Sequence, residues 1–90
     1  MDFKKSFGMR LRHARMASHL TQKQLAERIG VNHAAIAQYE AGSNTLPVER
    51  AAQLAQVLGV SLDYLCGLTA DPHPYPPDPG DDPDEQGSTP

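Results

Sequence analysis

Residues 21–42, TQKQLAERIGVNHAAIAQYEAG, decide the fold of this 90-residue chain. The pattern predicts two short helices joined by a tight turn. The first helix is expected over residues 22–29, where Thr21 is placed to cap its N-terminus. Gly30 supplies the turn, because glycine enters left-handed backbone geometry without steric cost. The segment therefore begins as a capped helix that stops at a defined residue.

The second helix of this segment is expected to run from Asn32, which can cap it, to about Ala41, before Gly42 ends it. The apolar side chains of the segment are expected to face inward: Leu25, Ala26, Ile29, Val31, Ile36 and Tyr39. Short, uncharged side chains form the expected outward face of the second helix: Asn32, His33, Ala34, Ala35 and Gln38. Side chains of this size on the second helix of a helix-turn-helix can read base edges in a major groove.

The flanking sequence predicts three further helices and no strand. An amphipathic stripe at helical spacing indicates a first helix over residues 3–18, with Phe7, Leu11, Ala14 and Ser18 on one face. A fourth helix is expected over residues 47–58, because proline suits a first helical turn. Its inward face is expected to hold Val48, Ala51, Leu54, Ala55 and Leu58. Ser61 can cap a last helix over residues 62–66. The prediction is an all-α, compact five-helix domain over residues 1–68.

The remaining 22 residues, 69–90, differ in composition from this domain. They hold seven of the eight prolines and six acidic residues but no basic residue, whereas residues 1–68 carry eight basic and five acidic residues. The formal net charge of −3 is therefore the sum of +3 on residues 1–68 and −6 on residues 69–90. So few apolar side chains cannot offset the entropy of ordering, which predicts a disordered acidic tail with polyproline-II bias. The PxxP pattern of residues 74–77 is a weak docking motif, and a solvated tail is the favoured interpretation.

Other classes of protein are disfavoured by the composition. The chain has no apolar run of about 20 residues for a membrane span, and its N-terminus lacks an apolar signal core. Its single cysteine, Cys66, cannot form an internal disulfide, which fits a cytoplasmic location. The four histidines are scattered, so no metal site or cofactor is expected. Without a catalytic arrangement of side chains and a pocket to hold it, an enzyme is not expected.

Residues 8–68 resemble the phage-repressor (lambda-repressor-like) helix-turn-helix family, also called xenobiotic-response-element-type regulators. The matching residues are Gly8, Arg10, Leu11, Arg12, Arg15, Leu20, Thr21, Gln22, Leu25, Ala26, Gly30, Val31, Ile36, Tyr39, Glu40, Gly42, Leu54, Ala55, Leu58, Gly59, Val60 and residues 61–65. The resemblance covers about two thirds of the chain. It implies a sequence-specific transcriptional regulator that binds double-stranded DNA.

The resemblance also implies roles for individual residues. The positions that face base edges match Asn32, His33, Ala34 and Gln38. For Asn32 the alternative is a pure helix cap, and for His33 an exposed side chain without a base contact. The matching phosphate contact is Gln22. The loop after the second helix of the motif lacks the Lys or Arg common in the family, so further phosphate contacts are expected from Lys23, Asn44, Thr45 and Arg10. Surface solvation is the alternative for Arg10.

Two further roles follow from the resemblance. Arg15 and Glu40 match a partly buried ion pair, so both are expected to be structural. The last helix, with Leu62, Tyr64 and Leu65, matches the family's dimer surface; the alternative is that both leucines close the core. His19 replaces a frequent glycine, and is expected to accept left-handed geometry there.

The leading hypothesis is a dimeric repressor on a pseudo-palindromic operator, of mobile-element, restriction-modification or toxin–antitoxin type. The alternative is an antitoxin or adaptor whose acidic tail or last helix binds a protein partner. The tail could instead fold back on the chain's own DNA-binding face and weaken non-specific binding, whereas a solubilising extension is the favoured interpretation.

Overall fold

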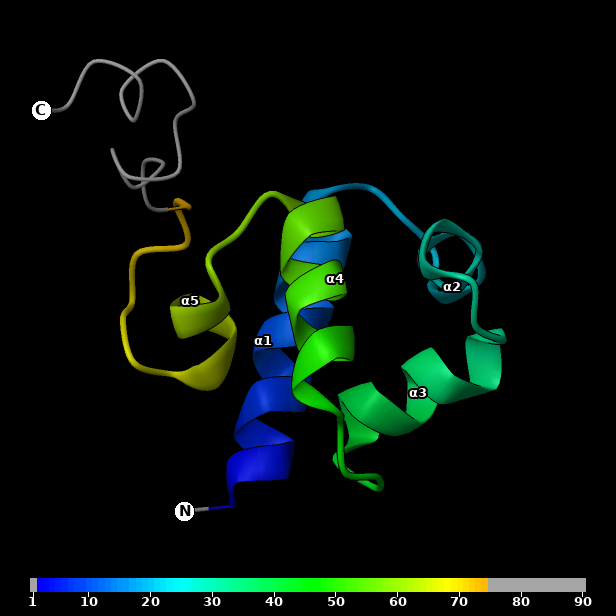
Figure 1. The fold of residues 1–90 in the computed structure, drawn as a ribbon, viewed down its shortest axis with the longest axis horizontal. Coiled ribbons are helices and arrows are strands. Elements are labelled where there is room, and N and C mark those ends of the chain that lie inside the picture. The colour runs from blue at the N-terminus through cyan, green and yellow to red at the C-terminus, as the bar shows by residue number, and fades with distance from the viewer. Residues whose placement is uncertain (1, 75–90) are drawn as a thin grey trace, which may run out of the picture.

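The computed structural model describes residues 2–74, and this part of the chain forms five α-helices and no strand (Figure 1). Their bounds are α1 (Phe3–Ala17), α2 (Gln22–Ile29), α3 (His33–Ala41), α4 (Val48–Leu58) and α5 (Leu62–Cys66). The predicted all-α, five-helix fold is confirmed, and every predicted helix end lies within one residue of the observed one. None of these helices is long and apolar enough to cross a membrane.

Local hydrogen bonds explain why α2 begins where it does. The Thr21 hydroxyl accepts a hydrogen bond from the Gln24 N–H at 3.0 Å, and the Gln24 side-chain oxygen accepts one from the Thr21 N–H at 2.9 Å. This reciprocal pair is a capping box, which satisfies two N–H groups that an open helix end would leave without partners. At the other end Gly30 has a φ of 74°, the left-handed geometry that the sequence predicted.

The next helix ends follow the same logic. The Asn32 side chain accepts a hydrogen bond from the Ala35 N–H at 3.0 Å, so it caps α3 as predicted. His19 closes the turn after α1 with a φ of 59°, which confirms the expectation of left-handed geometry. The hydroxyl of Ser61 caps α5 by accepting from the Tyr64 N–H at 2.9 Å.

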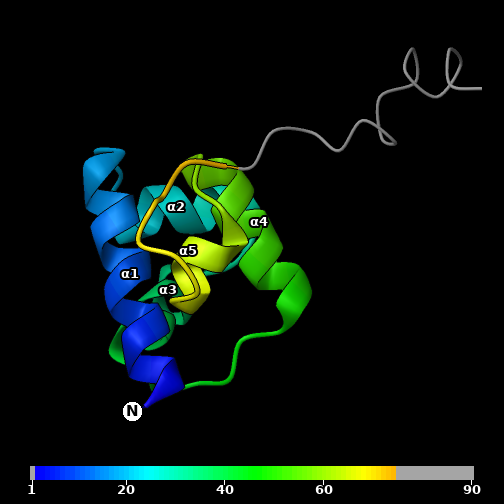
Figure 2. The same cartoon turned by 90° about the vertical axis from the view of Figure 1, so that its left-hand side faces the viewer.

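Helix α1 contacts α3, α4 and α5, while α2 packs on α3 and α4 (Figures 1 and 2). The apolar faces of all five helices meet in one core. The core residues are Phe7, Leu11, Ala14, Leu25, Ala26, Ile36, Ala51, Leu54, Ala55, Leu58 and Leu65. Ile29, Val31 and Tyr39 are partly buried against this core, so the predicted inward face of residues 21–42 is confirmed.

The predicted position of Val48 on the buried face of α4 is wrong. Its side chain is 71% exposed, and the buried stripe of the helix begins at Ala51. Val48 is the first residue of α4, with Pro47 as the N-cap, and it lies at the open edge of an apolar hollow beside Phe3. Helical periodicity places Val48 on the buried side of α4 but cannot show that burial begins only one turn later, at Ala51.

The chain beyond α5 stays in contact with the helices as far as the structure describes it. The Ser61 N–H donates to the Pro72 carbonyl oxygen at 2.9 Å, and the N–H and imidazole of His73 lower the pKa of the exposed Asp71. Figure 2 shows this segment, yellow to orange, rising past α5 to the C-terminal end of α4. This segment continues to residue 74, six residues past the predicted domain end at residue 68. The rest of the predicted tail, residues 75–90, lies outside the described residues.

Gly8 allows the close approach of α1 to α3. A Cβ atom at this position would overlap the Glu40 carbonyl oxygen and lie 2.5 Å from the Tyr39 carbonyl oxygen. Both are backbone atoms, which cannot move aside without displacing the helix. The separation of α1 and α3 is therefore set by the absence of a side chain at residue 8.

We predict that Gly8→Ala destabilises the domain by about 3 kcal/mol, because the added methyl group forces two packed helices apart. Urea unfolding followed by circular dichroism measures the effect. Gly59→Ala is the matched control: its φ of 67° makes alanine strained, but an added Cβ meets no atom within 4 Å. That variant should lose only about 1 kcal/mol. Equal losses for the two variants would contradict the proposed steric constraint.

Candidate nucleic-acid interface

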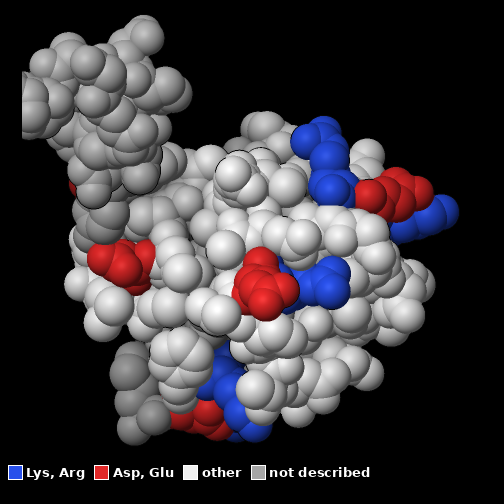
Figure 3. All heavy atoms as spheres, viewed as in Figure 1, with Lys and Arg blue, Asp and Glu red and all other residues white. Residues whose placement is uncertain are grey.

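The outward face of α3 carries no charged side chain. His33, Ala34, Gln38 and Ala41 are exposed, and Ala37 between them is half-buried. Figure 3 shows an uncharged surface over this part of the domain, with basic and acidic groups lying beside one another elsewhere on the same face. Of the predicted outward residues, Ala35 is half-buried, because it lies nearer to the core side of the helix. Short side chains leave the α3 backbone open to close approach by a partner.

The orientation of α3 is fixed by a buried polar contact with α1. The Arg15 Nε atom donates to Glu40 Oε2 at 2.5 Å and Nη2 donates to Oε1 at 3.1 Å, a bidentate ion pair. The two side chains are only 13% and 5% exposed. Arg15 Nη1 also donates to the Leu20 carbonyl oxygen at 2.8 Å, which ties in the turn before α2. These contacts agree with the structural role expected for Arg15 and Glu40.

Gln22 joins the same contact from the first position of α2. Its Nε2 donates to Glu40 Oε1 at 3.1 Å. Glu40 therefore accepts hydrogen bonds from side chains of two other helices, Arg15 of α1 and Gln22 of α2. We call Arg15, Gln22 and Glu40 the polar hub. The hub places the N-terminus of α2 beside the C-terminal half of α3, and free N–H groups at a helix N-terminus favour anions.

Gln38 and Asn44 form a second contact at this surface. The Asn44 amide donates to Gln38 Oε1 at 2.5 Å, and both residues are exposed. The contact holds the Gln38 side chain against the loop that follows α3. A carbonyl oxygen has two lone pairs, so Gln38 retains one acceptor site and both amide protons for a further partner. A predicted base-reading residue, Gln38, thus contacts a predicted phosphate-contacting residue, Asn44.

Arg12 is a candidate DNA contact that the sequence analysis missed. With the polar hub, it lines a hollow of about 330 Å³ whose other wall is Ala37 and Ala41 of α3. Its side chain is exposed, and it makes no ion pair with any residue in 2–74. The spacing along the sequence could have predicted this position. Arg12 and Arg15 follow Gly8 by four and seven residues, so all three share the face of α1 that meets α3.

Arg10 lies apart from these residues. Its guanidinium donates to the carbonyl oxygen of Ser6 at 3.5 Å and to the Ser6 hydroxyl, and it borders Gly67 after α5. It lies two positions before Arg12, which places it on a different side of α1. The structure does not bring Arg10 to α3. Lys23, Asn44 and Thr45, the other predicted phosphate contacts, are exposed at the start of α2 and in the loop after α3.

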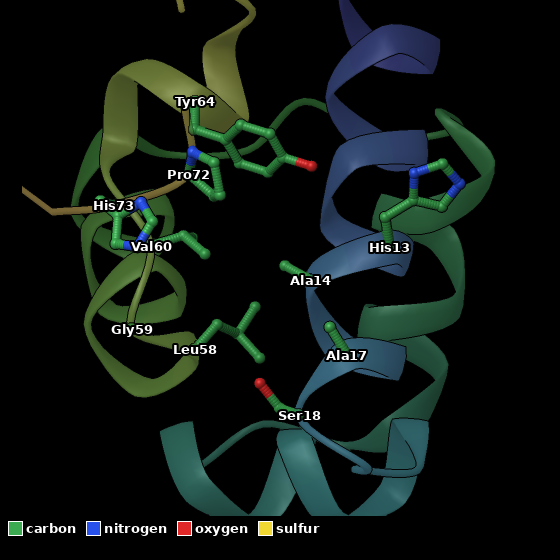
Figure 4. A pocket seen from close by; sticks show the side chains of 10 residues that line it. All are labelled: His13, Ala14, Ala17, Ser18, Leu58, Gly59, Val60, Tyr64, Pro72 and His73. Atoms are coloured by element: carbon green, nitrogen blue, oxygen red, sulfur yellow. The ribbon is translucent and has the colours of Figure 1, made fainter. Parts of the chain in front are cut away.

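The predicted dimer surface loses one residue in the structure. Leu65 is fully buried in the core, so its side chain is not available at the surface, whereas Leu62 and Tyr64 are half-buried. Tyr64 forms one wall of a hollow of about 420 Å³ between α1, α5 and the segment at Pro72. Figure 4 shows its hydroxyl directed toward α1. Within residues 2–74 no group of three or more His, Cys and acidic side chains is placed to hold a metal ion.

We predict that Arg15→Ala destabilises the domain by about 3–5 kcal/mol, because it leaves the buried Glu40 carboxylate without its cation. Arg12→Ala removes an arginine of the same helix and the same hollow without breaking an ion pair. It should change stability by no more than about 0.5 kcal/mol. Thermal unfolding of the two variants measures the difference. A normal unfolding temperature for Arg15→Ala would reassign Arg15 from scaffold to phosphate contact.

Comparison with known proteins shows which family the sequence and fold resemble. A family model described as helix-turn-helix matches residues 11–65. An uncharacterized HTH-type transcriptional regulator of Bacillus subtilis, YobD, is 46% identical over 65 residues, which make up 72% of this chain and 58% of that protein. The cryptic phage CTXphi transcriptional repressor RstR of Vibrio cholerae is 36% identical over 61 residues, or 68% of this chain and 54% of that one.

A solved structure has the same fold. The restriction-modification controller protein C.AhdI of Aeromonas hydrophila superposes with a TM-score of 0.65 at 30% identity, covering 68% of this chain and 88% of that one. The chain spans little more than half the length of the curated relatives that it matches. The matched region contains α2, α3, the polar hub and the start of α5. The chain belongs to the helix-turn-helix family of phage-repressor, or xenobiotic-response-element, type.

Proposed function

We propose that this protein is a sequence-specific DNA-binding transcriptional regulator that inserts α3 into the major groove. The observation that carries the proposal is the exposed, uncharged face of α3, held rigidly by the polar hub. A reading helix must approach the bases closely and keep its orientation, and these two features meet that need. The relatives named as transcriptional regulators support the proposal.

The side chains on this face suit direct readout of bases. Gln38 presents an amide, which can pair bidentately with adenine, and Ala34 can contact a thymine methyl group. Asn32 uses its Oδ1 atom to cap α3, which leaves its amide protons for a base or a phosphate. His33, in the first turn of α3, is exposed and can donate a hydrogen bond to a guanine or a phosphate.

Phosphate contacts are assigned to the residues around α3. Lys23 and the N-terminus of α2 approach one strand beside the hub, and Arg12 adds a cation that makes no ion pair within residues 2–74. Asn44 and Thr45 follow α3 in the adjoining loop. Gln22 can bind a phosphate with its remaining amide proton while it holds Glu40. These contacts would position α3 without reading sequence.

We further propose that the protein acts as a dimeric repressor. One recognition helix reads only a few base pairs, and two-fold pairing places two such helices about 34 Å apart on successive turns of the groove. Leu62 and Tyr64 remain as the surface residues of the last helix for this pairing. The similarity to a phage repressor and to a restriction-modification controller supports a regulator of this kind.

We expect Gln38→Ala and Arg12→Ala to affect DNA binding differently. Loss of a base-reading amide should cost about 1–3 kcal/mol and relax the preference at a single base pair. Loss of a phosphate-contacting arginine should weaken binding to all sequences alike and reduce the salt slope by about one ion per protomer. Fluorescence anisotropy titrations at several salt concentrations measure both. The assignment of Gln38 fails if its variant keeps the wild-type sequence preference.

Selection of bound fragments from a random pool of duplexes tests the dimer. We expect enrichment of a pseudo-palindrome whose half-sites are separated by about 10 base pairs, one helical turn. Enrichment of a single unrepeated half-site would indicate a monomeric reader instead. Failure to enrich any sequence, with tight binding retained, would count against sequence-specific regulation altogether.

A further inference from the structure

Two apolar hollows lie along the seam between α4 and α5. One, of about 390 Å³, lies beside the C-terminal half of α4, and the other, of about 290 Å³, lies near its N-terminus. Leu62 lines both hollows. We call this surface the α4–α5 groove. It runs from Ala52 and Gln56 past Leu62 to Phe3, Val48 and Cys66.

The end of the groove near the N-terminus of α4 exposes two large apolar side chains. Phe3 is 59% exposed and Val48 is 71% exposed. The ring of Phe3 lies 6.2 Å from that of Phe7, which faces the core, so an aromatic pair forms one wall. Lys4 lines the same end of the groove. An aromatic-lined apolar groove with a cation beside it suits an extended, proline-rich, acidic segment.

The chain itself supplies such a segment at the opposite end of the groove. The last described residue, Pro74, already lines the first hollow, and the sequence continues as Tyr75-Pro76-Pro77-Asp78-Pro79. A polyproline-II segment rises about 3.1 Å per residue, so these five residues span about 15 Å. The 11 residues of α4 span about 16 Å at 1.5 Å per residue. The segment therefore matches in length the helix that flanks both hollows.

We propose that residues 75–79 of the chain lie in the α4–α5 groove of their own domain, with the following acidic residues directed to Lys4. Tyr75, the bulky side chain of the segment, enters beside Leu62, and the prolines follow the apolar floor. Asp78 and Asp81 then reach the end of the groove that Lys4 lines. The surface that binds the segment is distinct from the outward face of α3.

Tethering makes even a weak interaction sufficient. A segment that begins directly after a fixed residue experiences an effective concentration in the millimolar range. An intrinsic dissociation constant of about 1 mM then leaves the groove occupied in half of the molecules. The proline-rich chain also loses little conformational entropy on binding, because it is already extended. The weakness of an isolated PxxP pattern is therefore no obstacle to its use within one chain.

Docking has a consequence for pairing. The segment would cover Leu62, one of the two residues left for the proposed dimer surface. Pairing through α5 would then require the segment to leave the groove, so the two states compete for one surface. The acidic tail would act as an intramolecular competitor of dimer formation. The docking itself does not depend on the proposed DNA-binding function.

Cys66 gives a direct measure of groove occupancy. It is the single cysteine of the chain, and it lines the groove near Phe3. Burial, and to a smaller extent the neighbouring Asp63 carboxylate, raises the pKa of the Cys66 thiol. The labelling rate must therefore be measured over a pH series, which separates the reactivity of the thiolate from its population.

The experiment compares the alkylation rate of Cys66 by iodoacetamide in the full chain, in Tyr75→Ser and in Gln86→Ser. The protein is diluted until sedimentation shows single protomers. We expect Tyr75→Ser to raise the rate at least about twofold, since half-occupancy halves access to the thiol. Gln86→Ser, a change in the same tail outside the docking segment, should leave the rate unchanged. Nuclear Overhauser contacts between the Tyr75 ring and the Leu62 methyl groups should appear in the wild type.

Three outcomes overturn the proposal. Equal rates in the wild type and Tyr75→Ser, without contacts to Leu62, show that the groove is open. Protection of Cys66 that appears only as protein concentration rises assigns the groove to a second copy of the chain. An equal increase in both variants shows a general effect of the tail rather than docking of residues 75–79.

Discussion

The bidentate contact between Arg15 and Glu40 is the interaction on which the rest of the structure depends. It links α1 to the end of α3, and Gln22 extends it to the start of α2. The contact is almost wholly buried, so each charge needs the other to offset its loss of hydration. A buried ion pair adds little net stability compared with apolar packing, but it is highly directional. Its main effect is therefore to select one orientation of α3.

Steric packing fixes the separation of α1 and α3, the two helices that the ion pair joins. Gly8 lets the α1 backbone approach the last turn of α3, where Tyr39 and Glu40 present their carbonyl oxygens. The carboxylate of Glu40 can then reach Arg15 one and a half to two turns further along α1. A larger residue at position 8 would move the helices apart and lengthen both hydrogen bonds of the pair. Close packing and charge pairing thus specify the same geometry, which is a mark of a well-determined fold.

Local chemistry made most of the fold predictable. Thr21, Asn32 and Ser61 cap helices through hydrogen bonds to residues three positions away, and such signals are fully contained in the sequence. What could not be predicted depends on distant contacts. Val48 falls on the apolar stripe of α4 but lies beyond the edge of the core. The hydrogen bond from the Ser61 N–H to the Pro72 carbonyl oxygen joins two backbone groups, so no side-chain pattern in the sequence could predict it. In the candidate site, Arg12 was missed because its role depends on where α3 crosses α1.

The use of Arg15 inside the scaffold limits the electrostatics of the proposed reading surface. Arg15, one of the two arginines that face α3, is paired with Glu40. The cations that remain near the recognition helix are Arg12, Lys23 on α2 and Lys5, which packs against Gly42 at the end of α3. Each phosphate contact contributes to affinity through counterion release, so few cations mean a shallow salt dependence per protomer. Two protomers on one duplex double the number of contacts and add the second helix as a tethered ligand. A device that controls pairing, such as a tail segment competing for Leu62, would therefore act on DNA affinity more strongly than any single surface charge.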